Sequence, residues 1–171
     1  MGHGLAKAVA AAVAVAAAVA VAVGWMLWPW PTAAPVSATT TRQYLDASAC
    51  LLTGADGVTP GTPGAPVWRA MESASAATRV MASYLPAATP ADAGPMLNTL
   101  LERQCGVIVV MDASLAQVAK TAKANPARRF ILVTGSAADG PAVVPSNAVV
   151  VQAADAARPI DQAVTALAGA A

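Results

Sequence analysis

Small polar residues directly follow several apolar runs of this chain, where a loop would expose them. Asp112 comes after the run Gly106–Met111, and Thr134 closes the run that begins at Arg129. A carboxylate and a hydroxyl in such positions can hydrogen-bond a small polar ligand. With the residues after an earlier run and one nearby aromatic ring, the candidate ligand-binding set is Thr53, Gly54, Asp56, Trp68, Asp112 and Thr134.

Each of these candidates also has a purely structural interpretation. Asp112 has the right type and position to cap the helix that follows it, and Thr134 is a common turn residue. Trp68 can stack on a ligand or pack beneath the glycine-rich loop that precedes it. The residue types alone leave both interpretations open.

The residue types give little support to catalysis, cofactor binding or metal binding. The only histidine, His3, precedes the long apolar segment near the amino terminus, so the rest of the chain cannot form a Ser/His/Asp or Cys/His arrangement. Metal-ligand spacing is absent. The loop Gly54–Pro66 has no lysine, no arginine and no G-x-G-x-x-G pattern, which argues against a nucleotide site. The net charge of +1, with scattered basic residues, argues against a nucleic-acid partner.

Cys50 and Cys105 each stand near the start of an apolar run. In the sheet predicted below these runs are neighbouring parallel strands, so the two thiols would lie near the same amino-terminal edge. In an oxidising compartment they would form a disulfide, provided that their Cα atoms lie within about 7 Å. The alternative is two buried thiols that act as small apolar side chains.

The stretch from Gly106 to Thr134 indicates the fold class. Its first run is continuous and β-branched, which predicts a strand buried on both faces. Leu115, Val118 and Ala122 then recur with helical spacing, and the second run, from Arg129, is again typical of a buried strand. Two buried strands joined by a helix are parallel, with a right-handed crossover.

The same alternation extends to both sides of this stretch. We predict an α/β fold with a single doubly wound five-stranded parallel sheet, in strand order 2-1-3-4-5, and helices on both faces. Functional loops of such a sheet lie at its carboxyl edge. The predicted strands are 49–53, 79–85, 106–111, 129–134 and 147–152, and the predicted helices begin at Val67, Pro90, the Asp112 cap and Pro159.

A long uncharged segment precedes this domain. No charged residue occurs between Lys7 and Arg42, and the apolar part, at roughly 20 residues, is long enough to cross a bilayer core as a helix. Lys7 marks its near end as cytoplasmic, and three tryptophans cluster at its far end. We predict a single-pass membrane protein with a cytoplasmic start at 1–7, a transmembrane anchor at 8–28, an extracytoplasmic linker at 29–47 and one α/β domain at 48–171.

The competing interpretation of this segment is a cleaved secretory signal, because Val36-Ser37-Ala38 has the small-residue pattern of a cleavage site. The apolar region exceeds the roughly 7–15 residues of most signals, which favours a retained anchor. Both interpretations place the domain outside the cytoplasm, and cleavage would release it as a secreted protein. A lipid anchor is not expected, because the first cysteine, Cys50, lies far beyond the apolar run.

One long segment resembles the amino-terminal lobe of the basic membrane protein (BMP) family, the extracytoplasmic solute-binding components of certain ABC transporters. The segment is YLPAATPADAGPMLNTLLERQCGVIVVMDASLAQVAKTAKANPARRFILVTG, in which Leu-x-x-x-x-Cys-Gly leads into a buried strand and Asn-Pro-x-x-x-Phe into the next. The stretch CLLTGADGV similarly resembles the first strand and turn of the family. The likeness covers about Cys50 to Gln152.

The resemblance implies a lobe that binds a small polar solute, with an ABC permease or a second copy of the chain as partner. In the family, an Asp-x-Ser-Phe-Asn type motif after the first strand grips the ligand, often a nucleoside. Here that loop reads TPGTPGAPVW, which leaves Asp56 or Trp68 to replace the motif by polar contact or stacking. Family members continue into a second lobe, whereas this sequence ends at Ala171. The alternative is a non-catalytic interaction domain that has lost ligand binding.

Overall fold

A computed structural model of the chain describes residues 43–135 and 143–171. The described residues belong to one compact unit. The predicted transmembrane segment lies outside the described residues, and none of the helices within them is long and apolar enough to cross a membrane. The principal elements are β1 (Ser48–Thr53), α2 (Gly64–Thr78), β2 (Met81–Pro86), α3 (Ala93–Glu102), β3 (Val107–Val110), α4 (Leu115–Ala124), β4 (Arg129–Thr134), β5 (Ala148–Gln152) and α5 (Ala157–Ala170).

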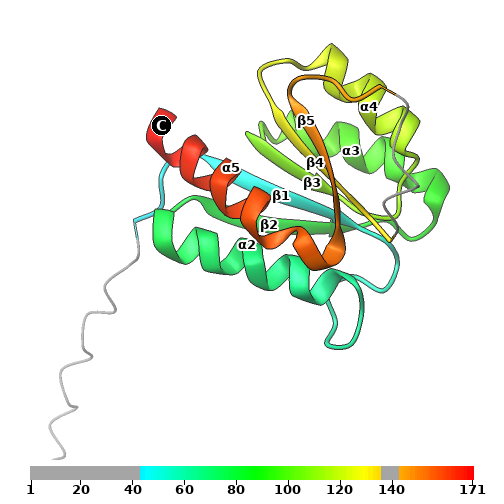
Figure 1. The fold of residues 1–171 in the computed structure, drawn as a ribbon, viewed down its shortest axis with the longest axis horizontal. Helices are drawn as coiled ribbons and strands as arrows, with labels where there is room; N and C mark the ends of the chain where they lie inside the picture. Colours follow the sequence, from blue (N-terminus) through cyan, green and yellow to red (C-terminus); the bar gives the residue numbers. More distant parts are fainter. Residues whose placement is uncertain (1–42, 136–142) are drawn as a thin grey trace, which may run out of the picture. The chain divides into compact units, whose positions relative to one another are not determined.

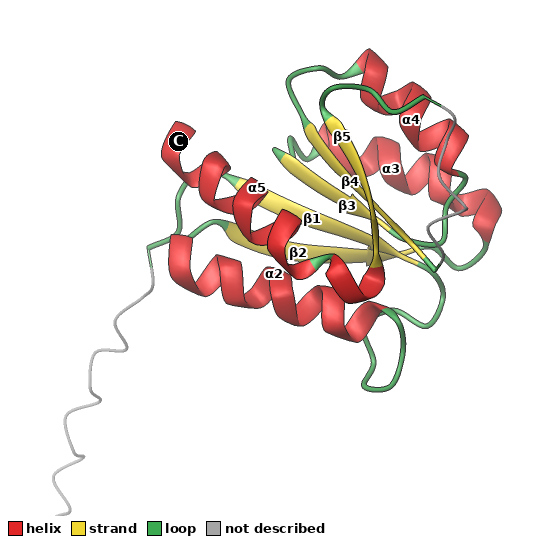
Figure 2. Cartoon of the chain, viewed as in Figure 1, coloured by secondary structure: helices red, strands yellow, loops and turns green. Residues whose placement is uncertain are grey.

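The five strands form one parallel sheet in the order β2-β1-β3-β4-β5 (Figures 1 and 2), which confirms the predicted topology. The central strand β3 pairs with β1 through Val109 opposite Leu51, and with β4 through Val109 opposite Ile131. Because every strand runs in the same direction, all five carboxyl ends emerge at one edge.

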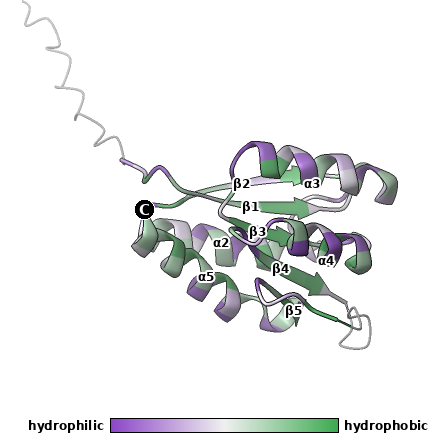
Figure 3. Ribbon diagram, turned by 90° about the horizontal axis from the view of Figure 1, so that it is seen from above, coloured by the Kyte–Doolittle hydropathy of each residue, from purple (hydrophilic) through white to green (hydrophobic). Residues whose placement is uncertain are grey.

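Helices α2 and α5 lie side by side over one face of the sheet, and α3 and α4 cover the other (Figures 1 and 3). Alternate residues of each inner strand therefore enter two separate cores. The first core contains Leu51, Val109 and Ile131 with Met71 of α2 and Ile160 of α5. The second contains Leu52, Ile108 and Phe130 with Leu100 of α3 and Val118 of α4. Burial on both faces accounts for the continuous apolar runs in the sequence.

The start of α4 differs from the prediction. Ser114, not Asp112, is the N-cap residue, and its side chain accepts a hydrogen bond from the Gln117 amide at 3.5 Å. Asp112 lies two residues earlier with a positive φ of 53°. Its backbone conformation therefore belongs to the turn between β3 and α4, and the prediction that Asp112 caps this helix was wrong.

Other helix ends shift by only a few residues. A capping box precedes the helix predicted to start at Pro90: the amide and hydroxyl of Thr89 both donate to Oδ2 of Asp92, at 2.9 and 2.8 Å. It begins a short 3-10 turn, Pro90–Asp92, ahead of α3. Helix α2 begins at Gly64, three residues before the predicted start at Val67, and α5 begins at Ala157, two residues before Pro159.

A single side chain connects the end of α4 to the start of β5. The Nδ2 of Asn147 donates to the backbone carbonyls of Ala122, Asn125 and Arg128 at 2.9, 3.0 and 2.9 Å. These carbonyls lie at the carboxyl end of α4 and in the turn that follows, where those of Ala122 and Asn125 also accept backbone amides. Asn147 thus fixes the approach of the last strand to the sheet.

The two-core arrangement makes a direct prediction for Phe130. Its side chain is 0% exposed in the second core, so Phe130→Ala should lower the free energy of unfolding by about 3–5 kcal/mol, measured by denaturant titration. Val143→Ala is the control, because that side chain is 79% exposed and its truncation should change stability by less than about 0.5 kcal/mol. Equal effects of the two substitutions would contradict the packing described.

Candidate functional site

A cavity of about 280 Å³ lies at the carboxyl edge of the sheet. It opens among the loops that follow β1, β2 and β3, as expected for a parallel α/β fold. We call it the Thr53 cavity, after the last residue of β1. It is lined by Thr53, Gly54, Ala55, Asp56, Gly57, Thr62, Pro63, Gly64, Ala87, Ala88, Thr89, Pro90 and Asp112.

Thr53 carries a buried hydroxyl group with no hydrogen-bond partner in the described part of the chain. The residue is 2% exposed, and Oγ1 neither donates nor accepts there. Its backbone carbonyl, by contrast, accepts from the Ala87 amide at 2.8 Å. A buried hydroxyl without a partner lowers the stability of the folded state.

Asp112 lies against Gly54 across the ends of β3 and β1. A Cβ atom at Gly54 would come within 3.0 Å of Oδ2 of Asp112, so glycine allows the carboxylate to approach this closely. Asp112 is exposed, and no hydrogen bond or ion pair of its carboxylate occurs among the described residues. The φ of 53° is unusual for a residue with a side chain, although Asp tolerates it better than most. Backbone strain and a free carboxylate thus coincide at this edge.

The loop between β1 and α2 is held by its own threonines and by a close glycine contact. The hydroxyl of Thr62 donates to the Thr59 carbonyl at 2.8 Å, and the hydroxyl of Thr59 donates to the Asp56 carbonyl at 3.2 Å. The Gly57 carbonyl packs so tightly against Gly64 that a Cβ there would overlap it. A carbonyl oxygen therefore lies beside the first residue of α2, where an open helix terminus would otherwise favour an anion.

The structure brings four of the six predicted ligand-binding residues together. Thr53, Gly54, Asp56 and Asp112 all line the Thr53 cavity. Trp68 does not: its ring packs edge-on against Tyr84 of β2, with centroids 5.3 Å apart. Thr134 lies elsewhere along the same edge, where its hydroxyl donates to the Val151 carbonyl at 3.4 Å and the residue borders a separate cavity near the start of α5.

Sequence reasoning missed the contribution of the loop after β2. Ala87, Ala88, Thr89 and Pro90 close one side of the cavity. The signal was available, because β2 was predicted as a parallel neighbour of β1 and its carboxyl end must reach the same edge. The sequence around Thr89 indicates a helix start, and no local pattern shows that the residue also lines a cavity.

The lining of the cavity offers polar groups that can bind a small molecule. It contains carboxylates, hydroxyls and backbone groups, with no histidine, cysteine or lysine. Among the described residues, no group of three or more His, Cys, Asp and Glu could hold a metal ion. These groups can form hydrogen bonds and present negative charge to a small molecule.

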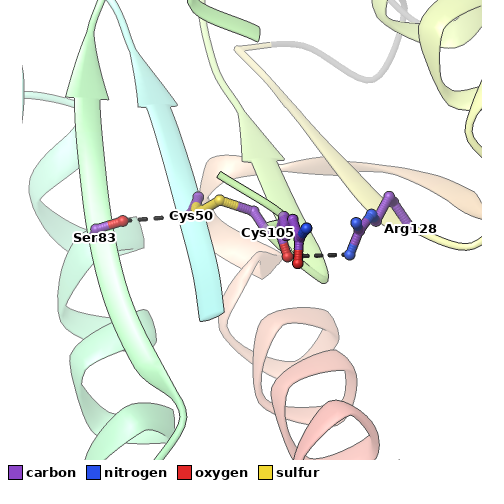
Figure 4. Close-up of a disulfide and its surroundings, with 5 residues drawn as sticks. Cys50, Ser83, Cys105 and Arg128 are labelled. Atoms are coloured by element: carbon purple, nitrogen blue, oxygen red, sulfur yellow. Dashed lines mark hydrogen bonds between the residues drawn. A yellow bond between two sulfur atoms is a disulfide. The ribbon is translucent and has the colours of Figure 1, made fainter. Parts of the chain in front are cut away.

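The two cysteines lie away from the cavity, toward the amino-terminal edge of the sheet. Their sulfur atoms are bonded in the structure, with the Cα atoms 5.9 Å apart (Figure 4). The hydroxyl of Ser83 on β2 donates to Sγ of Cys50 at 3.5 Å. On the other flank, Arg128 donates to the backbone carbonyl of Gln104, the left-handed residue before Cys105, at 3.0 Å. The disulfide thus links β1 to the start of β3.

The Thr53 hydroxyl generates a stability prediction. Thr53→Val keeps the shape and removes the unpartnered oxygen, so it should raise the free energy of unfolding of the ligand-free protein by about 1 kcal/mol in denaturant titration. Thr134→Val is the matched control: it removes a hydroxyl that has a partner, and should lower stability by about 0.5–1.5 kcal/mol. A loss of stability in Thr53→Val would show that its hydroxyl is already satisfied.

The disulfide generates a second prediction. Thiol titration of denatured, unreduced protein should find no free thiol, and the double variant Cys50→Ala/Cys105→Ala should lose about 2–4 kcal/mol of stability because its unfolded state is no longer cross-linked. Ser83→Ala, which keeps both cysteines, serves as the control for disturbance of this neighbourhood. Two titratable thiols in the purified protein would contradict the bond.

No family model and no curated protein matches this chain. Among solved structures, it is similar to the crystal structure of a fragment of a putative lipoprotein from Peptoclostridium difficile 630, with a TM-score of 0.54 and 15% sequence identity. The similarity covers 72% of this chain and 94% of that one. At this level of identity the similarity shows a shared fold and no more.

Proposed function

We propose that the chain is a membrane-tethered, extracytoplasmic lobe that binds a small polar solute, related to the BMP-family substrate-binding proteins of ABC transporters. The observation that carries this proposal is the Thr53 cavity, where a buried hydroxyl without a partner adjoins a cavity with a free carboxylate at the functional edge of the sheet. The proposal includes no catalytic step and no cofactor.

Three further features support this proposal. The sheet order and the two helical layers are those expected of such a lobe. The structural neighbour is described as a putative lipoprotein, and a membrane-associated location for this chain agrees with that description. A disulfide between Cys50 and Cys105 suits an oxidising compartment outside the cytoplasm. An ABC permease and a second copy of the chain are the proposed partners.

A nucleoside ligand has less support than other small polar solutes. The aromatic ring that was to stack on a base, Trp68, packs instead on Tyr84, and no aromatic side chain lines the Thr53 cavity. Stacking and hydrogen bonding normally combine to hold a nucleobase. We therefore place the ligand among small polar solutes without a large aromatic ring.

The exposed apolar residues of the edge strand β2 support the alternative function, a non-catalytic interaction domain. This edge strand, MASYLP, carries no charge, and its Met81 and Tyr84 are each 44% exposed. Edge strands usually carry charged or other protective residues against pairing with another chain. If the chain acts only by binding a protein partner at β2, no solute needs to bind in the Thr53 cavity. A test of solute binding therefore distinguishes the two functions.

A thermal-shift screen of the purified 171-residue chain in detergent micelles tests the leading proposal. Sugars, amino acids, amines and nucleosides should include at least one class that raises the melting temperature, because a ligand that binds only the folded state stabilises it. Gly54→Ala should weaken that ligand severalfold, since the new Cβ would displace the Asp112 carboxylate.

Gly135→Ala is the matched control for the Gly54 variant, because a Cβ at Gly135 meets no atom within 4 Å. Its ligand-dependent shift should equal that of the unmodified chain. If no solute class changes the melting temperature, the solute-binding proposal fails and the interaction domain takes its place.

A further inference from the structure

We propose that the edge strand β2 pairs with β2 of a second copy of this chain, antiparallel and centred on Ser83, so that the two sheets join into one. This inference goes beyond solute binding at the Thr53 cavity and does not depend on it. It rests on the directions of the free backbone groups of β2, on a groove beside the strand and on the charges that flank it.

The backbone of β2 has one free side with a defined pattern. The strand lies at a border of the sheet and pairs only with β1 among the described strands (Figure 3). The amides of Met81 and Ala87 both donate to carbonyls of β1, at 2.9 and 2.8 Å, so the odd-numbered residues of the strand face β1. The N–H and C=O groups of Ala82 and Tyr84, with the C=O of Pro86, therefore point away from the sheet.

A symmetric antiparallel pair centred on Ser83 satisfies these free groups. Ser83 then faces Ser83 of the second copy, and Ala82 of each chain lies opposite Tyr84 of the other. Each such pair exchanges both of its backbone hydrogen bonds. Every outward N–H group of the strand thus finds an acceptor in the second copy.

The neighbouring registers satisfy fewer groups. A pair centred on Tyr84 places Ala82 opposite Pro86, which has no amide to donate. A pair centred on Ala82 needs the Val80 amide, which already donates to Oγ1 of Thr78 at 3.4 Å. The register centred on Ser83 therefore follows from the backbone groups of this strand.

The same register matches apolar side chains on both faces of the joined sheet. Leu85 packs against the second core, so Met81, four residues earlier, lies on that face as well. In the dimer Met81 is opposite Leu85 of the second copy, and on the other face Tyr84 is opposite Ala82. Met81 and Tyr84 are each 44% exposed in the single chain, and pairing would cover both side chains.

A groove of about 650 Å³ borders the amino-terminal half of β2. Its lining includes Met81 and Ser83 of the strand, Trp68 and Ser75 of α2, and Arg103 at the end of α3. Because α2 and α3 cover opposite faces, the groove follows the border of the sheet and not one of its faces. An extended strand of a second copy would enter this space.

The charges beside β2 are complementary in such a dimer. The strand itself has none, whereas Arg69 and Glu72 are exposed about one turn apart on α2. Trp68 packs on Tyr84, and α2 runs opposite to β2, so a symmetry axis at Ser83 passes about two residues beyond Trp68. An axis there places Arg69 of one copy at about the level of Glu72 of the other, where opposite charges attract.

The predicted membrane tether favours a second copy as the occupant. The symmetry axis is perpendicular to the sheet, so both linkers start at equal height when this axis lies along the membrane normal. The predicted linker before residue 43 is long enough to span about 40 Å, more than the roughly 10 Å of a helical layer. Two copies on one membrane have a raised local concentration, which compensates for the small area between two short strands.

Sedimentation of the full 171-residue chain in density-matched detergent micelles tests the pairing. The unmodified chain should pass from monomer to dimer as the ratio of protein to detergent rises. Hydrogen exchange resolved to single residues should be about tenfold or more slower in the dimer for the amides of Ala82 and Tyr84. Exchange at Ala88, an exposed residue beyond the strand, should not change.

Ala82→Pro removes an outward amide and leaves the bonds to β1 in place. The monomer should therefore keep its melting temperature, while the dissociation constant of the dimer should rise about tenfold or more. Ala82→Ser is the matched control, because it changes the same side chain and keeps the amide. Its dissociation constant should stay within about threefold of that of the unmodified chain.

Met81→Lys is an independent test that leaves the backbone unchanged. It places a charge opposite Leu85 of the second copy, so the dissociation constant should again rise about tenfold or more. Val144→Lys is its control, because that side chain is 41% exposed, lies just before β5 at the other border of the sheet, and gains the same charge. This control should dimerise like the unmodified chain.

Two results would overturn the inference. The first is a chain that stays monomeric at every ratio of protein to detergent, which is also the result expected if a strand of another protein occupies β2. The second is a dimer that survives both Ala82→Pro and Met81→Lys, which would place the contact outside β2. Neither result bears on solute binding at the Thr53 cavity, which the thermal-shift screen tests separately.

Discussion

Burial of the central strands on both faces is the constraint on which the rest of the structure depends. Leu51 and Leu52 of β1 enter different cores, as do Ile108 and Val109 of β3, so a layer of helices is required on each side. Helical crossovers make the strands parallel, and parallel strands place all their carboxyl ends at one edge. The Thr53 cavity lies at that edge, where Thr53 and Asp112 follow the apolar runs of β1 and β3.

Two departures from ordinary local rules lie at this edge. The interior follows its apolar pattern closely, yet Thr53 buries a hydroxyl without a partner among the described residues, and Asp112 adopts a left-handed backbone. Each feature lowers stability, and each could be removed by a simple substitution such as valine or glycine. These features support the proposal of ligand binding at the cavity, because packing of the two cores does not require them.

The interior and the edge also differ in how far the sequence predicts them. The sheet order and the buried faces of α3 and α4 follow from apolar runs and helical spacing, which are local signals. The N-cap of α4 does not follow from local signals, because Asp112 and Ser114 are both suitable N-cap residues. The backbone conformation of the turn determines which of them caps the helix. Trp68 and Asn147 depend on distant partners: Tyr84 of β2 for one, and three carbonyls near the end of α4 for the other. No local pattern encodes such pairings, so they escaped prediction.

The position of Trp68 connects the two proposed functions. Its packing on Tyr84 leaves the Thr53 cavity without an aromatic surface, so any selectivity there must come from charge and hydrogen bonds. The same pair gives the edge strand β2 an aromatic side, next to Met81 and away from the cavity. Solute binding and partner binding would therefore use different surfaces of one rigid sheet, and the disulfide between β1 and β3 holds that sheet together at the edge opposite the cavity. The two surfaces meet where β2 ends, because the loop that follows it, Ala87 to Pro90, closes one side of the Thr53 cavity.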